Sequence, residues 1–525
     1  MKRILKFFAI SALALTTVSC DSYLDVNDNP NQATSTTAQQ VLPNALAITA
    51  STIVSYNDYG SGVAGYAANA GGFGFTGSPY ITYNYSTNNY TGLWSGVYDN
   101  ITDYQYIIDN TKNDPAFAKY NAIAKIMKSH QMQMLVDQYG DAPYSEAWEG
   151  VNNLSPKYDK AEDIYKDLIV QLDSAVYIID TFGDANNVGA SDIMFAGDME
   201  KWKRFANTLK LRMLVRVSNV GSLASFVNER FATFGSSPIF LTDDALVQPG
   251  YLISNGKLNP YWNTYHSNAA GTASGAGRQY IPSKFILSLY TSRISDPERG
   301  KVIYRSYPNT PSNQLGDQTD GIPTAPSGAI AWYTGTGTAN SLGLFKGRTM
   351  GQPIILAAES YFLQAEARER GLLAGSAADA YKNGIISSFR YLYKDANGNV
   401  DATKNPTTDA NAYIAANTDN TAGANGNNLV DYEKSTNKIE TIITQKYIAL
   451  NFIHGHEAWS EYRRTGYPSL TPTSTFVSVA SQATSADRLP KRMIYPATEY
   501  QLNSANAPAA APGFVFNNPI FWDIN

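Results

Sequence analysis

Cysteine, histidine and charged side chains are scarce in this 525-residue chain. A single cysteine leaves no partner for an intramolecular disulfide, and only four histidines are present. Charged residues make up 16% of the sequence, and 40 basic against 45 acidic residues give a net charge of −5 without any basic block. Nucleic-acid binding requires clustered lysine and arginine to neutralise phosphates, so the composition argues against a nucleic-acid partner.

The sequence also lacks the usual catalytic motifs. It contains neither a P-loop nor a G-x-S-x-G elbow. A G-x-G-x-x-G match at residues 72–77 follows no strand pattern, so we reject a dinucleotide site. His454 and His456 are two residues apart on a predicted helix, where their side chains diverge. We therefore expect no cofactor and no metal site, although two distant carboxylates could still form a glycosidase pair.

The single cysteine ends a lipoprotein-type leader. A positively charged start precedes a short apolar run over residues 7–18, too short to span a bilayer. We predict a signal peptide over residues 1–19 and lipid on Cys20, with Thr17 standing where leucine is usual. An ordinary secretory signal is the alternative. Residues 20–37 are polar and turn-rich, as expected of a tether.

Most of the remaining chain shows the spacing of amphipathic helices. Apolar residues recur at steps of three and four, which places them on one helix face. The predicted helices cover residues 38–54, 93–108, 116–136, 161–179, 198–216, 353–370, 376–392 and 439–465.

Two of these segments carry further information. Residues 353–370 and 376–392 alternate small and large side chains, as tetratricopeptide-type hairpins do when they pack closely. The helix over 439–465 has an apolar first half and a charged, aromatic second half that could hold buried ion pairs. Residues 396–428 are polar and read as a long surface insertion.

Aromatic residues gather in segments without helical periodicity. Tyrosine is the dominant aromatic, with 36 residues, and a phenol ring can both stack on a ligand and form a hydrogen bond. Core aromatics usually sit in a periodic apolar context, which these segments lack. We therefore predict a ligand surface, with packing of these rings on the body as the alternative. The predicted ligand-binding residues are Tyr80, Tyr83, Tyr85, Tyr261, Trp262, Tyr265, Trp332 and Tyr333.

Several long motifs resemble one family. QKYIALNFIHGHEAWSEYRRTGYP at 445–468, followed by RLPKRMIYP at 488–496, resembles the C-terminal part of the SusD/RagB nutrient-binding outer-membrane lipoproteins. YGDAPYSEA at 139–147, the helix over 198–216 and the segment 353–370 resemble other parts of the family, in the same order. The resemblance implies a mostly α SusD-like fold, with tetratricopeptide-type hairpins and long irregular loops, as one domain over residues 20–525.

The resemblance also implies a function. Members of this family, typical of Bacteroidota, are outer-membrane lipoproteins that bind an oligomeric nutrient without catalysis and deliver it to a SusC-like TonB-dependent transporter. By this analogy the protein faces outward, its helical hairpins dock the transporter, and its aromatic loops hold the ligand. A glycan is the first expectation and a peptide the second. A surface glycoside hydrolase and a purely structural surface protein remain open alternatives.

Overall fold

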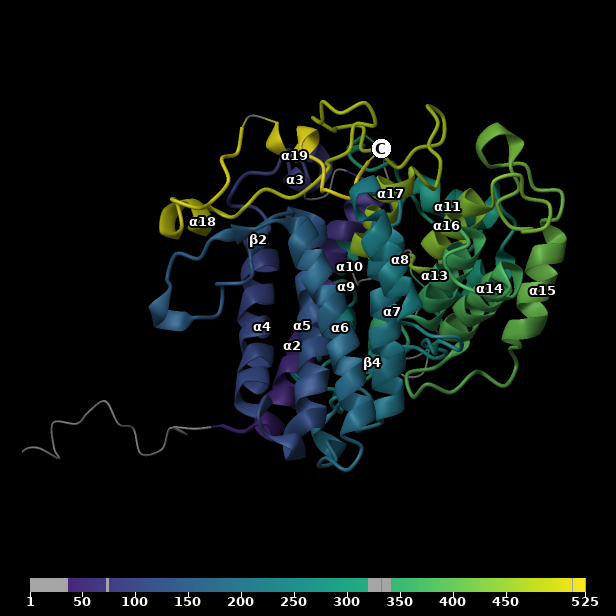
Figure 1. The fold of residues 1–525 in the computed structure, drawn as a ribbon. Coiled ribbons are helices and arrows are strands. Elements are labelled where there is room, and N and C mark those ends of the chain that lie inside the picture. The colour runs from purple at the N-terminus through teal and green to yellow at the C-terminus, as the bar shows by residue number, and fades with distance from the viewer. Residues whose placement is uncertain (1–35, 72–74, 320–331, 333–340, 512, 525) are drawn as a thin grey trace, which may run out of the picture.

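The computed structural model describes residues 36–71, 75–319, 332, 341–511 and 513–524 (Figure 1). Five long helices stand side by side in its first half, each packed on the next along the row α2–α4–α5–α6–α7. Their bounds are α2 (Ala38–Val63), α4 (Thr91–Thr111), α5 (Ala118–Tyr139), α6 (Ala161–Thr181) and α7 (Met199–Val217).

A second helical group forms the other half of the molecule. It comprises α13 (Ala357–Glu369), α14 (Ala377–Tyr393), α15 (Pro406–Ala416), α16 (Lys438–Ala449) and α17 (Gly455–Thr465). Helices α13 and α14 pack as an antiparallel hairpin, and α13 contacts both α16 and α7. The mostly helical architecture that the sequence predicts is confirmed. No described helix is both long and apolar enough to cross a membrane.

Short elements connect the long ones. The short α-helices are α3 (Pro79–Thr82), α8 (Ala224–Ala232), α9 (Pro260–Tyr265), α10 (Gly275–Gln279), α11 (Lys284–Thr291), α12 (Pro297–Ile303), α18 (Ala497–Leu502) and α19 (Phe514–Asn517). The 3₁₀ turns are η1 (Pro115–Phe117), η2 (Gly150–Asn152), η3 (Gly189–Ser191), η4 (Gly221–Leu223) and η5 (Ala424–Gly426).

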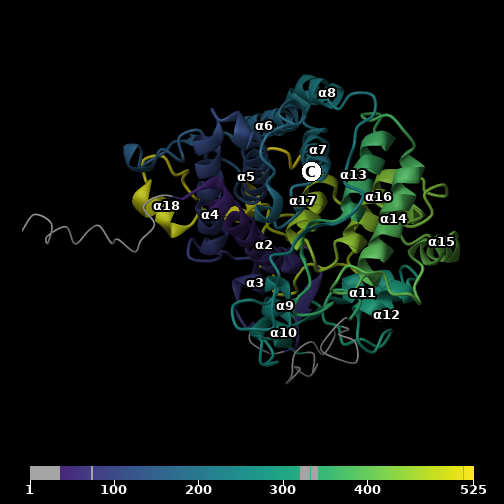
Figure 2. The same cartoon turned by 90° about the horizontal axis from the view of Figure 1, so that it is seen from below.

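The described strands form two-stranded antiparallel pairs. They are β1 (Ala67–Asn69) with β5 (Tyr280–Pro282), β2 (Ala142–Pro143) with β3 (Tyr158–Asp159), and β4 (Ala245–Val247) with β6 (Gln352–Ile355). Figure 2 shows α3, α9 and α10 next to one another at one edge of the molecule.

The first helix is longer than predicted, because α17 packs across its glycine-rich C-terminal end. Helix α2 continues to Val63 and packs on α17. A Cβ on Gly60 would lie 2.1 Å from the His456 nitrogen, and one on Gly455 would lie 2.4 Å from the Ser61 nitrogen. Glycine at both positions allows the two backbones to touch.

The predicted continuous helix over 439–465 is wrong: it is broken between α16 and α17. Phe452 takes a left-handed conformation, with φ of 59°, at the break. Asn57 on α2 holds this turn, since its amide nitrogen donates to the Phe452 carbonyl at 2.9 Å. Its side-chain oxygen accepts from the Gly455 nitrogen at 2.8 Å. The predicted surface insertion also contains a packed helix, because α15 buries Tyr413.

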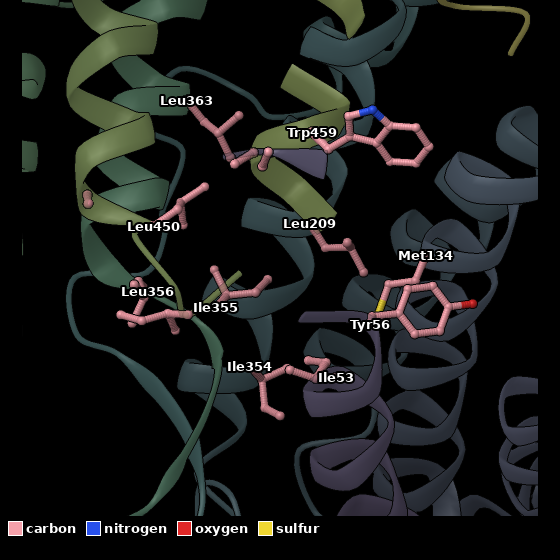
Figure 3. Packing of buried hydrophobic residues seen from close by; sticks show 14 of the residues in the cluster. Ile53, Tyr56, Met134, Leu209, Ile354, Ile355, Leu356, Leu363, Leu450 and Trp459 are labelled. Atoms are coloured by element: carbon pink, nitrogen blue, oxygen red, sulfur yellow. The ribbon is translucent and has the colours of Figure 1, made fainter. Parts of the chain in front are cut away.

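The two halves share one hydrophobic core. Figure 3 shows Ile53 and Tyr56 of α2 and Leu209 of α7 facing the same interior as Leu363 of α13 and Trp459 of α17. Each of these side chains is at most 1% exposed. Long helices far apart in the sequence are therefore joined by apolar burial, which supplies most of the folding free energy of a domain.

A network of buried charges crosses this core. Arg216 of α7 pairs with Asp137 of α5, and it contacts Glu457 and Glu461 of α17 at 2.5 and 3.0 Å. Arg464 of α17 contacts Glu366 of α13 at 2.6 Å. The ion pairs expected for the charged end of the 439–465 segment are confirmed.

The network acts differently on the pKa values of its buried carboxylates. Burial by itself raises the pKa of Glu457, but the positive charges of Arg212 and Arg216 outweigh it and hold this pKa well below its usual range. For Asp137 the burial dominates, and its pKa is raised even though Arg216 opposes the shift. Removal of one arginine would therefore leave buried carboxylates without a positively charged partner.

We predict that Arg216→Met lowers the free energy of unfolding by about 3–5 kcal/mol, because breaking a buried pair leaves its partners uncompensated. Urea denaturation followed by circular dichroism measures this loss. Lys112→Met, which removes the exposed pair of Lys112 with Asp109, is the control and should change stability by less than about 1 kcal/mol. Equal losses for both variants would contradict a structural role for the network.

Candidate functional site

The structure buries the aromatic side chains that the sequence predicts to bind ligand. Relative exposure is 0–5% for Tyr80, Tyr83, Tyr85, Tyr261, Trp262, Tyr265 and Trp332. A ring without an exposed face cannot stack on a ligand from solvent, so these side chains serve as core in this structure. Tyr333 and Cys20, with the whole leader, lie outside the described residues.

Two of these tyrosines, Tyr261 and Tyr265, also form hydrogen bonds inside the protein through their hydroxyl groups. The Tyr261 hydroxyl donates to the Phe452 carbonyl at 3.1 Å, and the Tyr265 hydroxyl donates to the Val54 carbonyl at 3.1 Å. The Trp332 ring stacks on Phe452, with centroids 4.5 Å apart and planes 8° from parallel. Satisfied buried hydroxyls and stacked rings are features of a packed core.

Nevertheless, the structure brings two of the predicted aromatic segments together. Tyr80 stacks on Tyr280 of β5, with centroids 5.2 Å apart, and Tyr265 lies 6.2 Å from the same ring. A cleft of about 510 Å³ lies between α2, the start of α4 and α9, and we call it the α2–α9 cleft. It is lined by Ser51, Val54, Ser55, Asp58, Tyr90, Gly92, Leu93, Pro260, Asn263 and Thr264.

Two helices place polar groups at the rim of the α2–α9 cleft. Ser51, Ser55 and Asp58 follow one another at steps of four and three along α2, so they share one face. On the other side, the Asn259 side chain caps α9 by accepting from the Trp262 nitrogen at 2.8 Å. This short helix turns its aromatic rings inward and leaves Asn263 exposed.

Tyr90 supplies the aromatic surface of the cleft. It is half-buried and sits in the left-handed region, with φ of 55°, at the start of α4. A non-glycine residue in this region costs free energy, and such strain is concentrated at functional sites. The Tyr90 ring packs edge-on against Tyr59, with centroids 5.3 Å apart, and against Tyr85 at 5.6 Å. The buried tyrosines thus hold one partly exposed ring in place.

Asp58 supplies the charge of the cleft. Burial raises the pKa of Asp58 to about 6, although a hydrogen bond from Tyr280 opposes the shift. No lysine or arginine of the described residues forms an ion pair with this carboxyl. It is therefore a poorly solvated acceptor that a donor group of a ligand would stabilise.

The chemistry of this lining suits recognition rather than bond cleavage. A half-buried ring beside a carboxylate, an amide and hydroxyl groups can bind a polyhydroxylated ring by stacking and hydrogen bonding. Glycoside hydrolysis uses two carboxyl groups, and Asp58 is the single one in this lining. Among the described residues, no group of three or more His, Cys, Asp or Glu side chains is placed to hold a metal ion.

Sequence reasoning missed Asp58, Tyr90 and Asn263 as site residues. Asn263 lies between the predicted Trp262 and Tyr265, and Tyr90 follows the predicted Tyr85 by five residues. Asp58 lies beyond the predicted end of the first helix, so its place in the polar stripe of α2 was not available. The predicted segments were thus nearer the cleft than the predicted side chains.

The fold is mostly helical, and the candidate cleft lies between α2, the start of α4 and α9. A family model described as "Starch-binding associating with outer membrane", of SusD-like type, matches residues 30–496. The chain therefore belongs to the SusD-like family, which confirms the resemblance seen in its motifs.

Solved structures of SusD type share this fold. A chitin-binding protein is 26% identical with a TM-score of 0.68, over 93% of this chain and 99% of that one. A chitin-binding SusD homologue from Flavobacterium johnsoniae is 22% identical with a TM-score of 0.67, over 92% and 99%. A SusD homologue from Bacteroides thetaiotaomicron is 20% identical with a TM-score of 0.69, over 94% and 100%. A search of curated proteins returned no significant match.

We predict that titration of Asp58 lowers the free energy of unfolding as pH rises from about 4 to 7. The folded protein holds the Asp58 proton up to a pKa of about 6, whereas an unfolded aspartate releases it near about 3.9. Asp58→Asn should therefore melt at a higher temperature than the wild type at pH 7.5, and the difference should shrink towards zero near pH 4. Differential scanning calorimetry measures both.

Ser55→Ala, in the same cleft, is the control without a titrating group. Its melting temperature should follow that of the wild type at every pH. A difference between Asp58→Asn and wild type that does not vary with pH would show that Asp58 is not held in a charge-disfavouring site.

Proposed function

We propose that this protein is a surface-exposed outer-membrane lipoprotein that binds an oligosaccharide and passes it to a SusC-like TonB-dependent transporter without cleaving it. The observation that carries the proposal is the α2–α9 cleft, in which the half-buried Tyr90 ring, the Asp58 carboxyl and the Asn263 amide line one space. Membership of a family described as starch-binding and associated with the outer membrane supports it.

Binding in the cleft follows from ordinary carbohydrate chemistry. The apolar face of a pyranose packs on Tyr90, and its hydroxyl groups donate to Asp58 and exchange hydrogen bonds with Asn263. A hydrogen bond to a charged group contributes about 1.5–3 kcal/mol, so Asp58 carries much of the specificity. Since no second carboxyl lines the cleft, the bound sugar is held and released intact.

A β-linked N-acetylglucosamine polymer is the first glycan to test, because the 26% identical relative is a chitin-binding protein. The acetamido N–H of such a sugar is a donor that a carboxylate accepts well. Starch follows from the family description. Peptides form the second ligand class, and nothing in the α2–α9 cleft favours them.

In this proposal, the other parts of the chain serve the delivery of the sugar to the transporter. Lipid on Cys20 holds the body at the outer leaflet, and the tether over residues 20–37 gives it reach. The packed α13–α14 hairpin offers the extended surface for the transporter. In this arrangement the ligand cleft lies beside α9, where the sugar is received.

We expect affinity electrophoresis of the mature protein to show retardation by one polysaccharide of a panel that includes chitin derivatives, starch and protein digests. Tyr90→Ala and Asn263→Ala should each weaken retardation at least about fivefold, since a stacking ring or a polar contact contributes about 1–3 kcal/mol. Tyr177→Ala, which removes a tyrosine that is 67% exposed on α6 far along the chain from the cleft, is the matched control.

Two results would contradict the proposal. Release of shorter sugars during the assay would show an enzyme. Retardation that survives both Tyr90→Ala and Asn263→Ala in folded protein would place the ligand elsewhere.

Trp262→Ala tests the residues chosen from sequence. Because the Trp262 ring is buried, we expect any lost affinity to be accompanied by lost stability.

We expect Cys20→Ser to abolish acylation and release the protein from membranes, because no other cysteine can carry the lipid. Metabolic labelling with a radioactive fatty acid and fractionation of cells measure this. Ser19→Ala, next to the same position, is the control that should keep the label. A membrane-bound, unlabelled wild type would contradict lipid anchoring.

A further inference from the structure

A second cleft lies on the helical-repeat side of the molecule. Helices α4, α5 and α6 stand side by side (Figure 1) and, with residues 144–149, enclose about 570 Å³. We call it the Trp148 groove; Gln105, Lys125, Lys128, Tyr144, Trp148 and Asp163 are among its lining. It shares no lining residue with the α2–α9 cleft.

Trp148 is distinct among the tryptophans of this chain. All seven fall within the described residues, and the other six are at most 4% exposed. Trp148 alone is half-buried, and its indole N–H donates no hydrogen bond to any residue that the structure describes. A partly exposed indole with a free donor is a ready contact for a ring-shaped polar ligand.

Polar groups with spare bonding capacity surround this ring. The Lys128 ammonium lies 4.0 Å from the Trp148 ring centroid and donates to the Gln105 side-chain oxygen at 2.7 Å. The Lys125 ammonium donates to the Gln171 oxygen at 2.8 Å. Neither lysine forms an ion pair with a described carboxylate. Burial lowers the pKa of Lys128 to about 8, a sign that its charge is poorly compensated.

Carboxylates face these lysines across the groove. Asp159 is engaged, because it accepts from the Tyr144 and Ser145 nitrogens at 3.0 and 2.8 Å. Asp163 has only a loose contact with Lys166, at 3.4 Å, and is exposed. Asp167 and Glu149 complete the acidic side of the lining.

This arrangement selects against charged ligands. An acidic ligand would meet four carboxylates, and a basic one would meet the two lysines. A neutral saccharide suits both, because its hydroxyl groups donate to carboxylates and accept from ammonium groups at the same time. Charge-assisted bonds of this kind are about twice as strong as neutral ones.

We propose that the Trp148 groove is a second saccharide-binding site, which takes a neutral sugar unit of the nutrient glycan against Trp148. The ligand class rests on the proposed function, but the residues are separate from those of the α2–α9 cleft. Two separate sites would let one protein hold a long glycan at two points, which raises avidity through effective concentration.

The test uses tryptophan fluorescence of the mature protein with neutral hexasaccharides of N-acetylglucosamine, glucose, mannose and xylose. The α2–α9 cleft contains no tryptophan, so a change in emission reports the groove. We expect one hexasaccharide to change the emission of wild type and Tyr90→Ala, and to leave that of Trp148→Phe unchanged. Calorimetry should show Lys128→Met weakening the groove site at least tenfold.

Lys119→Met is the matched control. Lys119 lies on the same helix, and its ammonium also bonds to a neutral oxygen, the Ala185 carbonyl at 2.9 Å, but it is outside the groove. The Lys119→Met variant should bind the hexasaccharide as tightly as the wild type does. If Lys128→Met fails to fold, Lys125→Met takes its place.

Several results would overturn the proposal. The proposal fails if none of the four sugars gives a Trp148-dependent response, or if Tyr90→Ala abolishes the response. It also fails if, with an acidic sugar and a tripeptide added as further probes, only one of these two gives a response. A response that persists while the α2–α9 cleft binds nothing would instead support the groove and remove the cleft from the proposed function. The two proposals therefore fail separately.

Discussion

The burial of Arg216 among three carboxylates is the constraint on which the rest of the structure depends. Its contacts join α5, α7 and α17, and Arg464 extends the network to α13. Buried charges tolerate little displacement, because an unpaired one is costly in a low-dielectric interior. With α17 fixed, the contact of Gly455 with Gly60 sets the position of α2, and α2 in turn carries one wall of the α2–α9 cleft.

The candidate site is built at the edge of an aromatic core. Tyr80, Tyr265 and Tyr280 pack together inside, and Tyr90 at the rim is held by a second group of buried rings, Tyr59 and Tyr85. The interior rings give rigidity, and the neighbouring polar residues of the same segments give contact. Rigid packing behind the polar residues allows the cleft between α2, α4 and α9 to be pre-formed, which lowers the entropic cost of binding.

The long helices, the α13–α14 hairpin and the family could be predicted from sequence, because local periodicity and extended motifs carry them. The break between α16 and α17 could not, since it depends on Asn57, which lies 395 residues from Phe452. Nor could the burial of Tyr261 and Tyr265. Their aperiodic context suggests exposure, yet backbone carbonyls of Phe452 and Val54 satisfy their hydroxyl groups in the core. Composition pointed to segments that border the candidate cleft, while tertiary packing decided which side chains face solvent.

The most direct measurement is hydrogen–deuterium exchange of the mature protein with and without the polysaccharide that it retains. The account predicts slower exchange on binding in the segments around Asp58, Tyr90 and Asn263, which line one cleft from three distant parts of the chain. Protection of all three would show that the polar rim of the aromatic core receives the sugar. Unchanged exchange in these segments, with protection elsewhere, would contradict the central claim.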